Sequence, residues 1–379
     1  MQLHHYSFQE SWNKDFDTSL DSSQTLVIVF GSSDVRKITQ ALQDVTRAFS
    51  HSIIIGASTS GEILMDTLQE ESLVVAVVKF QTTQIRLATE KLHNPEDSFE
   101  IGEKLANKLQ EKSLKSVFVL SDGLNVNGSD LTHGLNAGIH SDVIVSGGLA
   151  GDGATFSQTW VLVDGKTSSH YVTAVGLYGE NIHVGYGSEG GWDIFGIQRV
   201  VTKSSHNVVY ELDGQPVLDI YKKYLGEKAK DLPASGLLFP LGVYDAKEEG
   251  KIVVRTILAI DEDEKSITFA GNIPMQSKVC LMKSNNDRLI DAAQNSSNAL
   301  DLQNYTDEPL LNIAISCIGR KLVLKQRAEE ELEATLENLP KNSTQIGFYS
   351  YGEISPTGLI GCELHNQTMT LTTLWESDA

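Results

Sequence analysis

The sequence predicts an α+β or mixed α/β protein with two α/β halves, each holding mixed β-sheets flanked by helices. Short apolar runs typical of buried strands end repeatedly in Gly-rich segments, and apolar residues recur at helical spacing between them. Both kinds of segment occur in both halves, in an order that does not suggest a regular parallel array. We expect a lead-in over residues 1–24, an N-terminal domain over 25–190 and a C-terminal domain over 191–379.

The N-terminal domain is expected to begin with a strand, a helix and a second strand. Residues 1–24 are polar, and we expect them to be irregular. Residues 26–30 (LVIVF) have the composition of a buried strand, and Ser32 or Ser33 can cap the helix that follows. The next strand, residues 53–55, leads into the hydroxyl-rich loop 56–62 (GASTSGE). The helix between these strands has its apolar positions at Val35, Ile38, Leu42, Val45 and Phe49.

The rest of this domain alternates expected strands with two more helices. Asn94 and Pro95 predict a helix start, and Ile101, Leu105 and Leu109 form its apolar stripe. A shorter helix is expected over residues 131–139. Strands are expected at residues 73–80, 84–89, 116–120, 143–145, 159–163, 171–177 and 181–186.

The C-terminal domain is expected to start near Trp192, where the pattern changes. Helices are expected at residues 216–225, near 286–300 and at 325–339, and Pro340 ends the last one. We find no short-period repeat, although each half brings strands, helices and Gly-rich strand ends together in a loosely similar way. Strands are expected at residues 199–202, 208–212, 252–260, 266–270, 310–316, 346–351 and 368–375.

Composition excludes several classes of function. The chain has 379 residues, 40% of them hydrophobic and 21% charged, which is ordinary for a globular protein. Its formal net charge of −20 argues against nucleic acid or an anionic membrane as partner, because phosphates would be repelled. No apolar run is long enough to span a membrane, and no secretory signal is recognisable. The three cysteines are far apart, so we expect a reducing, cytoplasmic setting.

Several enzyme signatures are missing. The sequence has no Walker A loop, no H-E-x-x-H, no G-x-S-x-G elbow and no C-x-x-C. A formal G-x-G-x-x-G begins at Gly185, but an aromatic, Gly-rich stretch follows it where a dinucleotide fold needs a helix. Glu353, His365 and Cys317 could do acid–base or nucleophilic work, yet they lack a partner of the expected kind. We therefore expect a binding protein and no enzyme.

Small residues at strand ends are the first candidates for a binding site. The loop 146–153 (SGGLAGDG) contains Gly148 and Asp152. Ser58 lies in the hydroxyl-rich loop 56–62, which follows the expected strand at residues 53–55. Glycine allows a ligand or another strand to approach the backbone closely, so a tight turn in a packed sheet is the alternative. Arg320 follows an apolar strand, where it can hold a carboxylate bidentately or pair with a local glutamate.

The final hairpin supplies further candidates. Tyr351, Glu353, His365 and Asn366 are expected at strand ends and in a loop, where small-molecule sites are often built. An edge hairpin with ordinary turn chemistry is the alternative. His183, His206 and His365 show no paired metal spacing, and lone histidines of this kind are usually structural. One of the three would suffice as a haem axial ligand.

Taken together, several motifs resemble the FIST sensory family, a two-part module of N- and C-terminal halves. They cover residues 25 to 376, and their order and spacing carry the resemblance more than any single motif does. They are GASTSGEI at 56–63, SGGLAGDG at 146–153, VVYELDGQP at 208–216, FPLGV at 239–243, SCIGR at 316–320, GFYSYGEI at 347–354 and HNQTMT at 365–370.

The resemblance implies a ligand-sensing input protein of bacterial signalling that acts on a separate partner. A stand-alone subgroup of similar length binds haem, senses nitric oxide and regulates partner histidine kinases or cyclic-di-GMP enzymes. The resemblance therefore implies haem, but it does not place the axial ligand, for which His183, His206 and His365 are the candidates. The alternative is a sensor of a small polar metabolite such as an amino acid. Arg320 would then hold the carboxylate and Glu353 or Asp152 the amine, beside Ser58, Gly148, Tyr351 and Asn366. Whether the protein forms a homodimer stays open.

Overall fold

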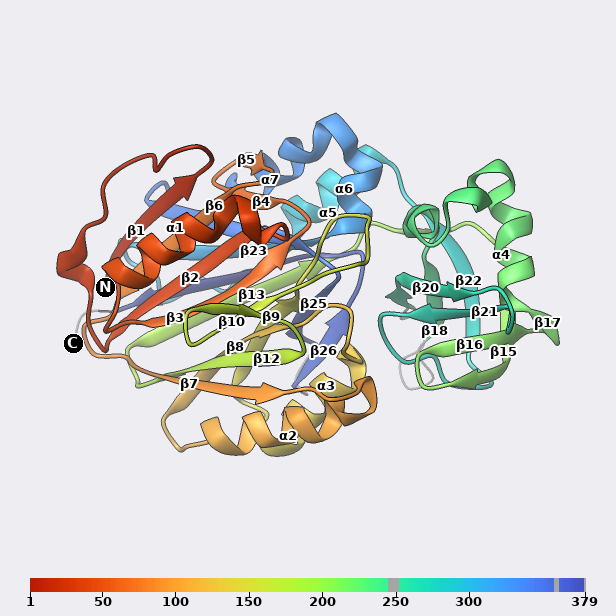
Figure 1. Cartoon of the computed structure of the whole chain (residues 1–379), viewed down its shortest axis with the longest axis horizontal. Helices are drawn as coiled ribbons and strands as arrows, with labels where there is room; N and C mark the ends of the chain where they lie inside the picture. Colours follow the sequence, from red (N-terminus) through yellow and green to blue (C-terminus); the bar gives the residue numbers. More distant parts are fainter. Residues whose placement is uncertain (245–251, 358–360, 378–379) are drawn as a thin grey trace.

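The computed structural model describes residues 1–244, 252–357 and 361–377, and it confirms a mixed α+β fold. Three six-stranded sheets form a large body, and a nine-stranded sheet forms a smaller one (Figure 1). We call residues 193–283 the small body and the rest the three-sheet body.

The three large sheets have the following strands, in spatial order. The first sheet consists of β1 (Gln2–Phe8), β6 (Leu73–Lys79), β2 (Thr25–Ser32), β3 (Ile53–Thr59), β10 (Val161–Val163) and β11 (Lys166–Ser168). The second consists of β7 (Gln84–Lys91), β12 (Tyr171–Tyr178), β8 (Leu114–Ser121), β9 (Ile144–Leu149), β25 (Gly352–Pro356) and β26 (Cys362–His365). The third consists of β13 (Ile182–Glu189), β27 (Met369–Glu376), β23 (Leu310–Cys317), β24 (Ser343–Ser350), β4 (Glu62–Leu64) and β5 (Thr67–Gln69).

The three large sheets share the same strand arrangement, so the fold contains three repeats. Each sheet has a parallel central pair, β2 with β3, β8 with β9 or β23 with β24, and an antiparallel strand beside the first member. Each sheet is completed by a hairpin from another repeat. The hairpin β4–β5 joins the third sheet, β10–β11 joins the first, and β25–β26 joins the second. The sequence shows no short-period repeat, and the repeat of this fold is a long unit whose hairpins pair outside their own repeat.

Glycines mark the equivalent positions of the three repeats. Gly56, Gly147 and Gly347 lie in the second strand of each parallel pair, and a Cβ there would collide with a carbonyl oxygen of the neighbouring strand. At the strand ends, the amide nitrogens of Ser60, Gly151 and Tyr351 each donate to a carbonyl of a different repeat, over 2.8, 3.0 and 3.2 Å. The three repeats are therefore closed into a ring by backbone hydrogen bonds.

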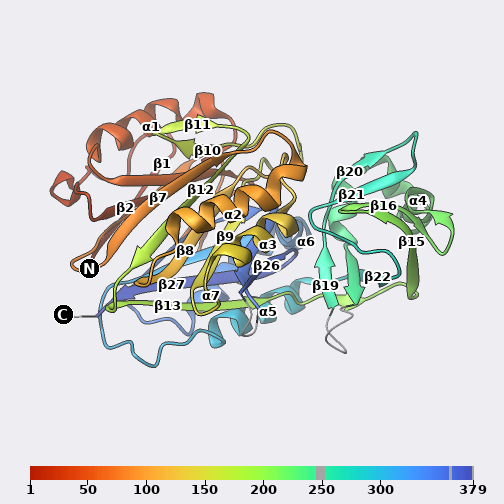
Figure 2. The same cartoon turned by 90° about the horizontal axis from the view of Figure 1, so that it is seen from below.

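The inner faces of the three sheets share one apolar core, and helices cover their outer faces. Phe30, Phe118 and Phe348 are among the buried residues of this core, one from each sheet. Full burial of each such side chain stabilises the fold by about 1.5–3 kcal/mol. Figure 2 shows α2 and α3 outside the second sheet. The helices of the body are α1 (Val35–Ala48), α2 (Ser98–Leu109), α3 (Gly128–Gly138), α5 (Asn286–Asn298), α6 (Ile318–Leu324) and α7 (Ala328–Leu336). Short 3-10 helices lie at Thr18–Leu20, Pro95–Asp97 and Lys325–Arg327.

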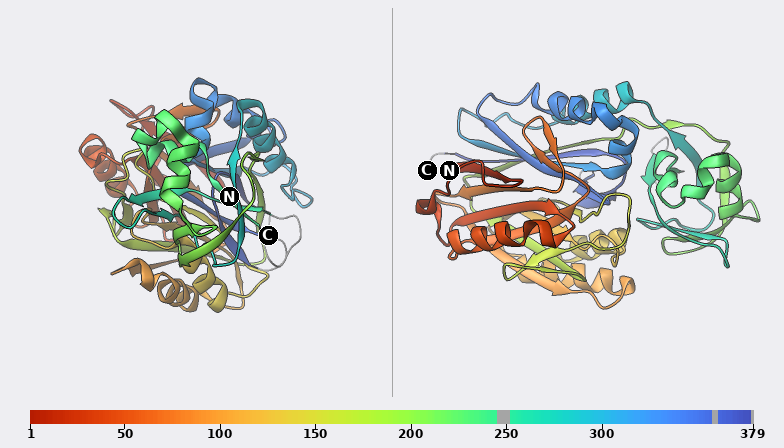
Figure 3. Two further views of the ribbon diagram at one scale, coloured as in Figure 1. Left: turned by 90° about the vertical axis from the view of Figure 1, so that its right-hand side faces the viewer. Right: turned by 45° about the horizontal axis from the view of Figure 1, so that its top comes forward.

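The small body is inserted between β13 and α5 of the third repeat. The left view of Figure 3 looks onto it, with its green helical segment nearest the viewer. The end of this segment, Ala234–Leu238, contacts α6 of the three-sheet body. This segment contains α4 (Val217–Leu225) and 3-10 helices at Gly226–Asp231 and Ala234–Leu238. The strands are β14 (Asp193–Ile194), β15 (Arg199–Ser205), β16 (Val208–Leu212), β17 (Gln215–Pro216), β18 (Leu241–Tyr244), β19 (Ile252–Arg255), β20 (Ile257–Asp261), β21 (Ser266–Phe269) and β22 (Lys278–Lys283).

We expected residues 1–24 to be irregular, and this prediction was wrong for part of the segment. Residues 2–8 form β1, which pairs with β6 over seven residues. Tyr6 is fully buried and packs against Phe16, whose ring centroid lies 4.9 Å away. Burial of aromatic side chains on one side of β1 therefore stabilises the strand, although many of its residues are polar. The domain boundary near residue 190 stays a prediction, although β13 and β27 pair across it within one sheet.

Candidate functional site

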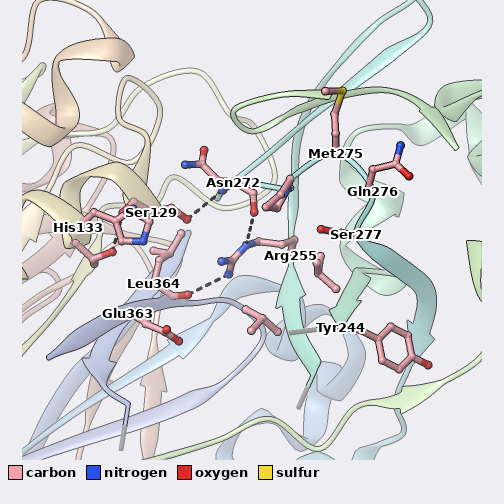
Figure 4. Close-up of a pocket in the computed structure, with 14 residues that line it drawn as sticks. Ser129, His133, Tyr244, Arg255, Asn272, Met275, Gln276, Ser277, Glu363 and Leu364 are labelled. Atoms are coloured by element: carbon pink, nitrogen blue, oxygen red, sulfur yellow. Dashed lines mark hydrogen bonds between the residues drawn. The ribbon is translucent and has the colours of Figure 1, made fainter. Parts of the chain in front are cut away.

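A pocket of about 450 Å³ opens where the small body faces α3 and β26 (Figure 4). The three-sheet body contributes hydroxyl groups, an imidazole and the end of the last hairpin, whereas the small body contributes apolar walls and one arginine. The lining residues are Ser129, Thr132, His133, Glu363 and Leu364 from the three-sheet body, and Val243, Tyr244, Val253, Arg255, Asn272, Pro274, Met275, Gln276 and Ser277 from the small body. A site made by two bodies is suited to sense their relative position.

Arg255 brings a positive charge into this pocket. It is the last residue of β19, and its half-buried side chain points toward β26 (Figure 4). Nη1 donates to the Leu364 carbonyl over 3.0 Å, and Nε donates to the Asn272 carbonyl over 3.4 Å. Burial lowers its pKa to about 10, with Glu363 opposing the shift, so the guanidinium stays charged at neutral pH.

Arg255 has no carboxylate partner among the described residues. Within residues 1–244, 252–357 and 361–377, no carboxylate lies within ion-pair distance of its guanidinium. A desolvated charge that only carbonyl oxygens contact costs stability, so such groups are usually paired or bind a ligand. The arrangement can therefore bind an anionic group of a small molecule.

Polar contacts between the two bodies support the pocket on one side. Asn272 receives a hydrogen bond from Asn127 Nδ2 over 2.7 Å and donates through its own Nδ2 to Asp130 over 2.7 Å. Its backbone amide donates to Ser129 Oγ over 3.0 Å, as Figure 4 shows. Asn127 also caps α3 by accepting from two backbone amides. The same side chain therefore begins the helix and fixes the loop of the small body beside it.

Sequence reasoning missed Arg255. The signal was present, because Arg255 interrupts the apolar run IVVRTILAI at residues 252–260. We assigned this run to a hairpin strand and examined the arginine that follows a different strand. Only the fold shows that the end of β19 lies against β26, since these strands belong to different sheets.

The predicted strand-end residues do come close together, but they are buried and bonded to one another. Ser58 Oγ accepts from the Trp160 amide over 3.0 Å. Asp152 accepts the hydroxyl of Tyr351 and the amides of residues 156–158. Burial raises the pKa of Asp152, yet these hydrogen bonds outweigh it and the pKa is lowered. Gly148 pairs with Glu353 in the register of β9 and β25.

Glu353 and Asn366 likewise have internal partners. Glu353 accepts from Ser350 Oγ over 2.6 Å and from Thr368 Oγ1 over 2.9 Å. Burial raises its pKa to about 8 despite these donors. Asn366 Oδ1 accepts from the Thr256 amide of the small body over 3.3 Å. None of these side chains lines the pocket that holds Arg255.

Arg320 is enclosed and fully engaged. Its guanidinium donates to Glu331 over 2.8 and 3.0 Å, to the Gly190 carbonyl over 2.6 Å and to the Leu289 carbonyl over 2.7 Å. Gly190 precedes the small body and Leu289 follows it, so this side chain fixes both connections between the bodies. Of the two alternatives for Arg320, the structure places it in an ion pair with a glutamate.

Comparison with protein families identifies the chain. Residues 25–215 match the FIST N domain, and residues 218–356 match the FIST C domain. The chain belongs to the FIST family. FIST domains are sensory domains of signal transduction, and the family is not a catalytic one. No curated protein matches this FIST chain.

The two matched FIST segments meet inside the small body. The first ends within β17 and the second begins in α4, which packs on the same sheet. The pocket is lined from both segments, because α3 belongs to the first and β19 to the second. Among the helices of the described residues, none is long and apolar enough to cross a bilayer.

The three histidines predicted as haem ligands lie in different surroundings in this FIST protein. His183 stacks on Trp375 with ring centroids 5.3 Å apart, and Nε2 lies 3.2 Å from Ser377 Oγ. His206 is largely exposed, and Nδ1 lies 3.7 Å from Asp130. His365 lines a groove of about 490 Å³ beside β13. In the part of the chain that the structure describes, no cluster of three or more His, Cys, Asp or Glu could hold a metal ion.

Proposed function

We propose that this FIST protein senses a small anionic metabolite, such as an amino acid, in the pocket between its two bodies. The observation that carries the proposal is the charged Arg255, which faces this pocket without a carboxylate partner in the described residues. A carboxylate of the ligand would bind the guanidinium bidentately. The apolar surface of Val243, Val253 and Pro274 would contact the rest of the molecule.

The pocket lining contains an acidic residue as well. Glu363 lies in the same lining and adds negative charge near the end of β26. An amino acid carries a carboxylate, which Arg255 would bind. A ligand that contacts both bodies would favour one of their relative arrangements, which is the requirement for a signal. The signal would pass to a separate partner, such as a histidine kinase or a cyclic-di-GMP enzyme.

Thermal shift and calorimetry with amino acids and small dicarboxylates test the proposal. A ligand at 100 times its Kd should stabilise the protein by about 2.7 kcal/mol, and Arg255→Gln should weaken binding at least tenfold. Arg36→Gln is the matched control, because this exposed arginine pairs with Asp34 far from the pocket. Equal affinity of the wild type and Arg255→Gln would exclude this site, and an absence of binding by every compound would contradict the proposal.

Haem-based sensing of nitric oxide is the second candidate, and His365 beside its groove is the observation that favours it. The fit is incomplete, because the described lining of the groove holds Asp301 and no lysine or arginine to bind the haem propionates. An absorption spectrum after haem loading tests this candidate. A sharp Soret band that shifts with nitric oxide and weakens in His183→Ala, His206→Ala or His365→Ala would support it. A spectrum like that of free haem would exclude it.

A further inference from the structure

Exposed apolar side chains are concentrated on the small body. Six large apolar residues are exposed in the described part of the chain, and five of them belong to residues 193–283. Three lie in the segment that leads out of the three-sheet body: Ile194 is 52% exposed, Phe195 44% and Ile197 64%. Such a cluster on a protein with a net charge of −20 requires an explanation other than folding.

A groove of about 670 Å³, with a lining that is about half apolar and half polar, adjoins this segment. Ile194, Ile252, Val254 and Met282 provide its apolar lining, and the connection Gly190–Trp192 forms one side. Arg320 and Gln367 hold this connection in place, because they bind the Gly190 carbonyl and the Trp192 indole. The groove therefore lies at the junction of the two bodies. We call Ile194, Phe195, Ile252, Val254, Met282 and Lys283 the hinge patch.

One lysine of the hinge patch and a second lysine beside it have no ion pair with a described residue. Lys283 Nζ lies 4.7 Å from the centre of the Phe195 ring, and Lys228 Nζ lies 5.6 Å from that of Phe239. The two phenylalanine rings are 5.9 Å apart, so both ammonium groups belong to one surface. Neither lysine forms an ion pair with any residue that the structure describes. By contrast, the Asp193 carboxylate at the same edge is paired with Arg288 over 2.6 Å.

We propose that the hinge patch is the docking surface for a partner protein, which binds it through a short segment of apolar and acidic side chains. The apolar residues of that segment would fill the groove, and its carboxylates would pair with Lys283 and Lys228. Repulsion by the acidic three-sheet body is weak there. Residues 193–283 hold 12 lysines and arginines against 13 acidic residues, and salt screens charges beyond about 8 Å under physiological conditions.

The position of the hinge patch couples it to the pocket that holds Arg255. Side chains alternate along β19, so Val253 and Arg255 line the pocket while Ile252 and Val254 line the groove. One edge strand thus separates the two sites. A shift of β19 that accompanies an event at the pocket would reshape the groove, and a partner bound there would detect it. Docking itself does not depend on the identity of the pocket's ligand.

Fluorescence anisotropy with two labelled peptides tests the docking surface. The probe is a 14-residue peptide of Leu, Phe and Glu, and its counterpart has Lys in place of each Glu. The acidic peptide should bind the full chain, and salt should weaken its binding. Ile194→Asp and Lys283→Glu should each weaken binding at least tenfold. Phe99→Asp is the matched control, because Phe99 is 44% exposed but lies on α2 of the three-sheet body. It should bind as the wild type does.

Three results would overturn the proposal. They are binding of the basic peptide as tightly as the acidic one, equal binding by the wild type and both hinge-patch variants, and no binding at all. Sedimentation of the free protein provides an independent measurement. Self-association that Ile194→Asp abolishes would show that a second copy of this chain occupies the patch in place of an acidic partner. Circular dichroism of each variant establishes that the fold is retained.

Discussion

The two bodies of this protein differ in how some of their ionisable groups are partnered. In the three-sheet body, buried ionisable groups such as Glu62, Glu353 and Arg320 have hydrogen-bond partners within the fold. In the small body, Arg255 contacts only carbonyl oxygens, and Lys228 and Lys283 form no ion pair with a described residue. Nearly all of the net charge of −20 lies on the three-sheet body. The proposed binding sites both use cations of the small body, whereas the buried ionisable groups of the three-sheet body are used within its fold.

Arg320 and Arg255 illustrate this difference between the two bodies. Arg320 and Arg255 both follow apolar strand residues and both are removed from bulk water. Arg320 pairs with Glu331 and binds two further carbonyls, so its bonding capacity is used inside the body. Arg255 donates to the carbonyl oxygens of Leu364 and Asn272, two residues that line the pocket between the bodies. Burial of an arginine therefore does not by itself indicate a binding role, and the proposal for Arg255 rests on its lack of a carboxylate partner among the described residues.

The largest expected effect is the loss of stability in Arg320→Ala. Removal of the guanidinium leaves the Glu331 carboxylate buried without its partner, which costs about 3–5 kcal/mol. Urea unfolding followed by circular dichroism measures this cost. Arg327→Ala is the control, because this arginine pairs with Glu330 and Asp287 at the surface and should matter far less. A comparable loss in the two variants would remove the contrast between enclosed and exposed pairs.

The next effect concerns pH and Glu353. Its pKa rises from 4.5 to about 8 on folding, so the folded state binds the proton more tightly and the contribution is fully present below pH 4.5. As pH rises from 4.5 to 8, this contribution is lost at up to about 1.4 kcal/mol per pH unit. Glu353→Gln, which stays neutral, should gain stability relative to the wild type across that range.

Urea unfolding of both proteins at pH 5, 6, 7 and 8 measures this difference. Some pH dependence should remain in Glu353→Gln, because burial also raises the pKa of Glu62 to about 7. Stability curves that run parallel at all four pH values would show that Glu353 does not titrate as its surroundings require.

The smallest effect is expected for Arg255→Gln in the absence of ligand. The substitution removes a desolvated charge while glutamine can still donate to the Leu364 carbonyl, so stability should change by less than about 1 kcal/mol. Thermal unfolding compares the variant with the wild type. A loss similar to that of Arg320→Ala would show that Arg255 serves the junction of the bodies rather than a ligand.

Much of the fold could be predicted from local patterns. The mixed α+β class is confirmed, and the buried strand at residues 26–30 and the helix that begins after Asn94 correspond to β2 and α2 with its preceding 3-10 turn. The threefold repeat could not be found this way, because β4–β5, β10–β11 and β25–β26 pair far from their neighbours in sequence. Its strongest signal was the glycine shared by IIIGAST, IVSGGL and TQIGFYS, but we assigned Gly56 and Gly147 to loops and Gly347 to a strand.

The candidate site was harder to predict. The Gly-rich strand ends are as close in space as their composition suggested, and Tyr351 and Asp152 meet there. The hydrogen bond between them could not be predicted, because the sequence does not show which polar groups will bond to one another. The pocket depends on a contact between the small body and the last hairpin, at a separation of 109 residues for Arg255 and Leu364. No local pattern specifies such a contact.

The exchange of hairpins has a consequence for how the protein comes apart. Each sheet of the three-sheet body borrows its last two strands from another repeat, so no repeat can complete its own sheet. A linear array of repeats can fray from one end, because each unit depends only on its neighbours. A closed ring has no end from which to fray. Its slowest-exchanging amides should therefore open together, in a single cooperative event that involves all three repeats.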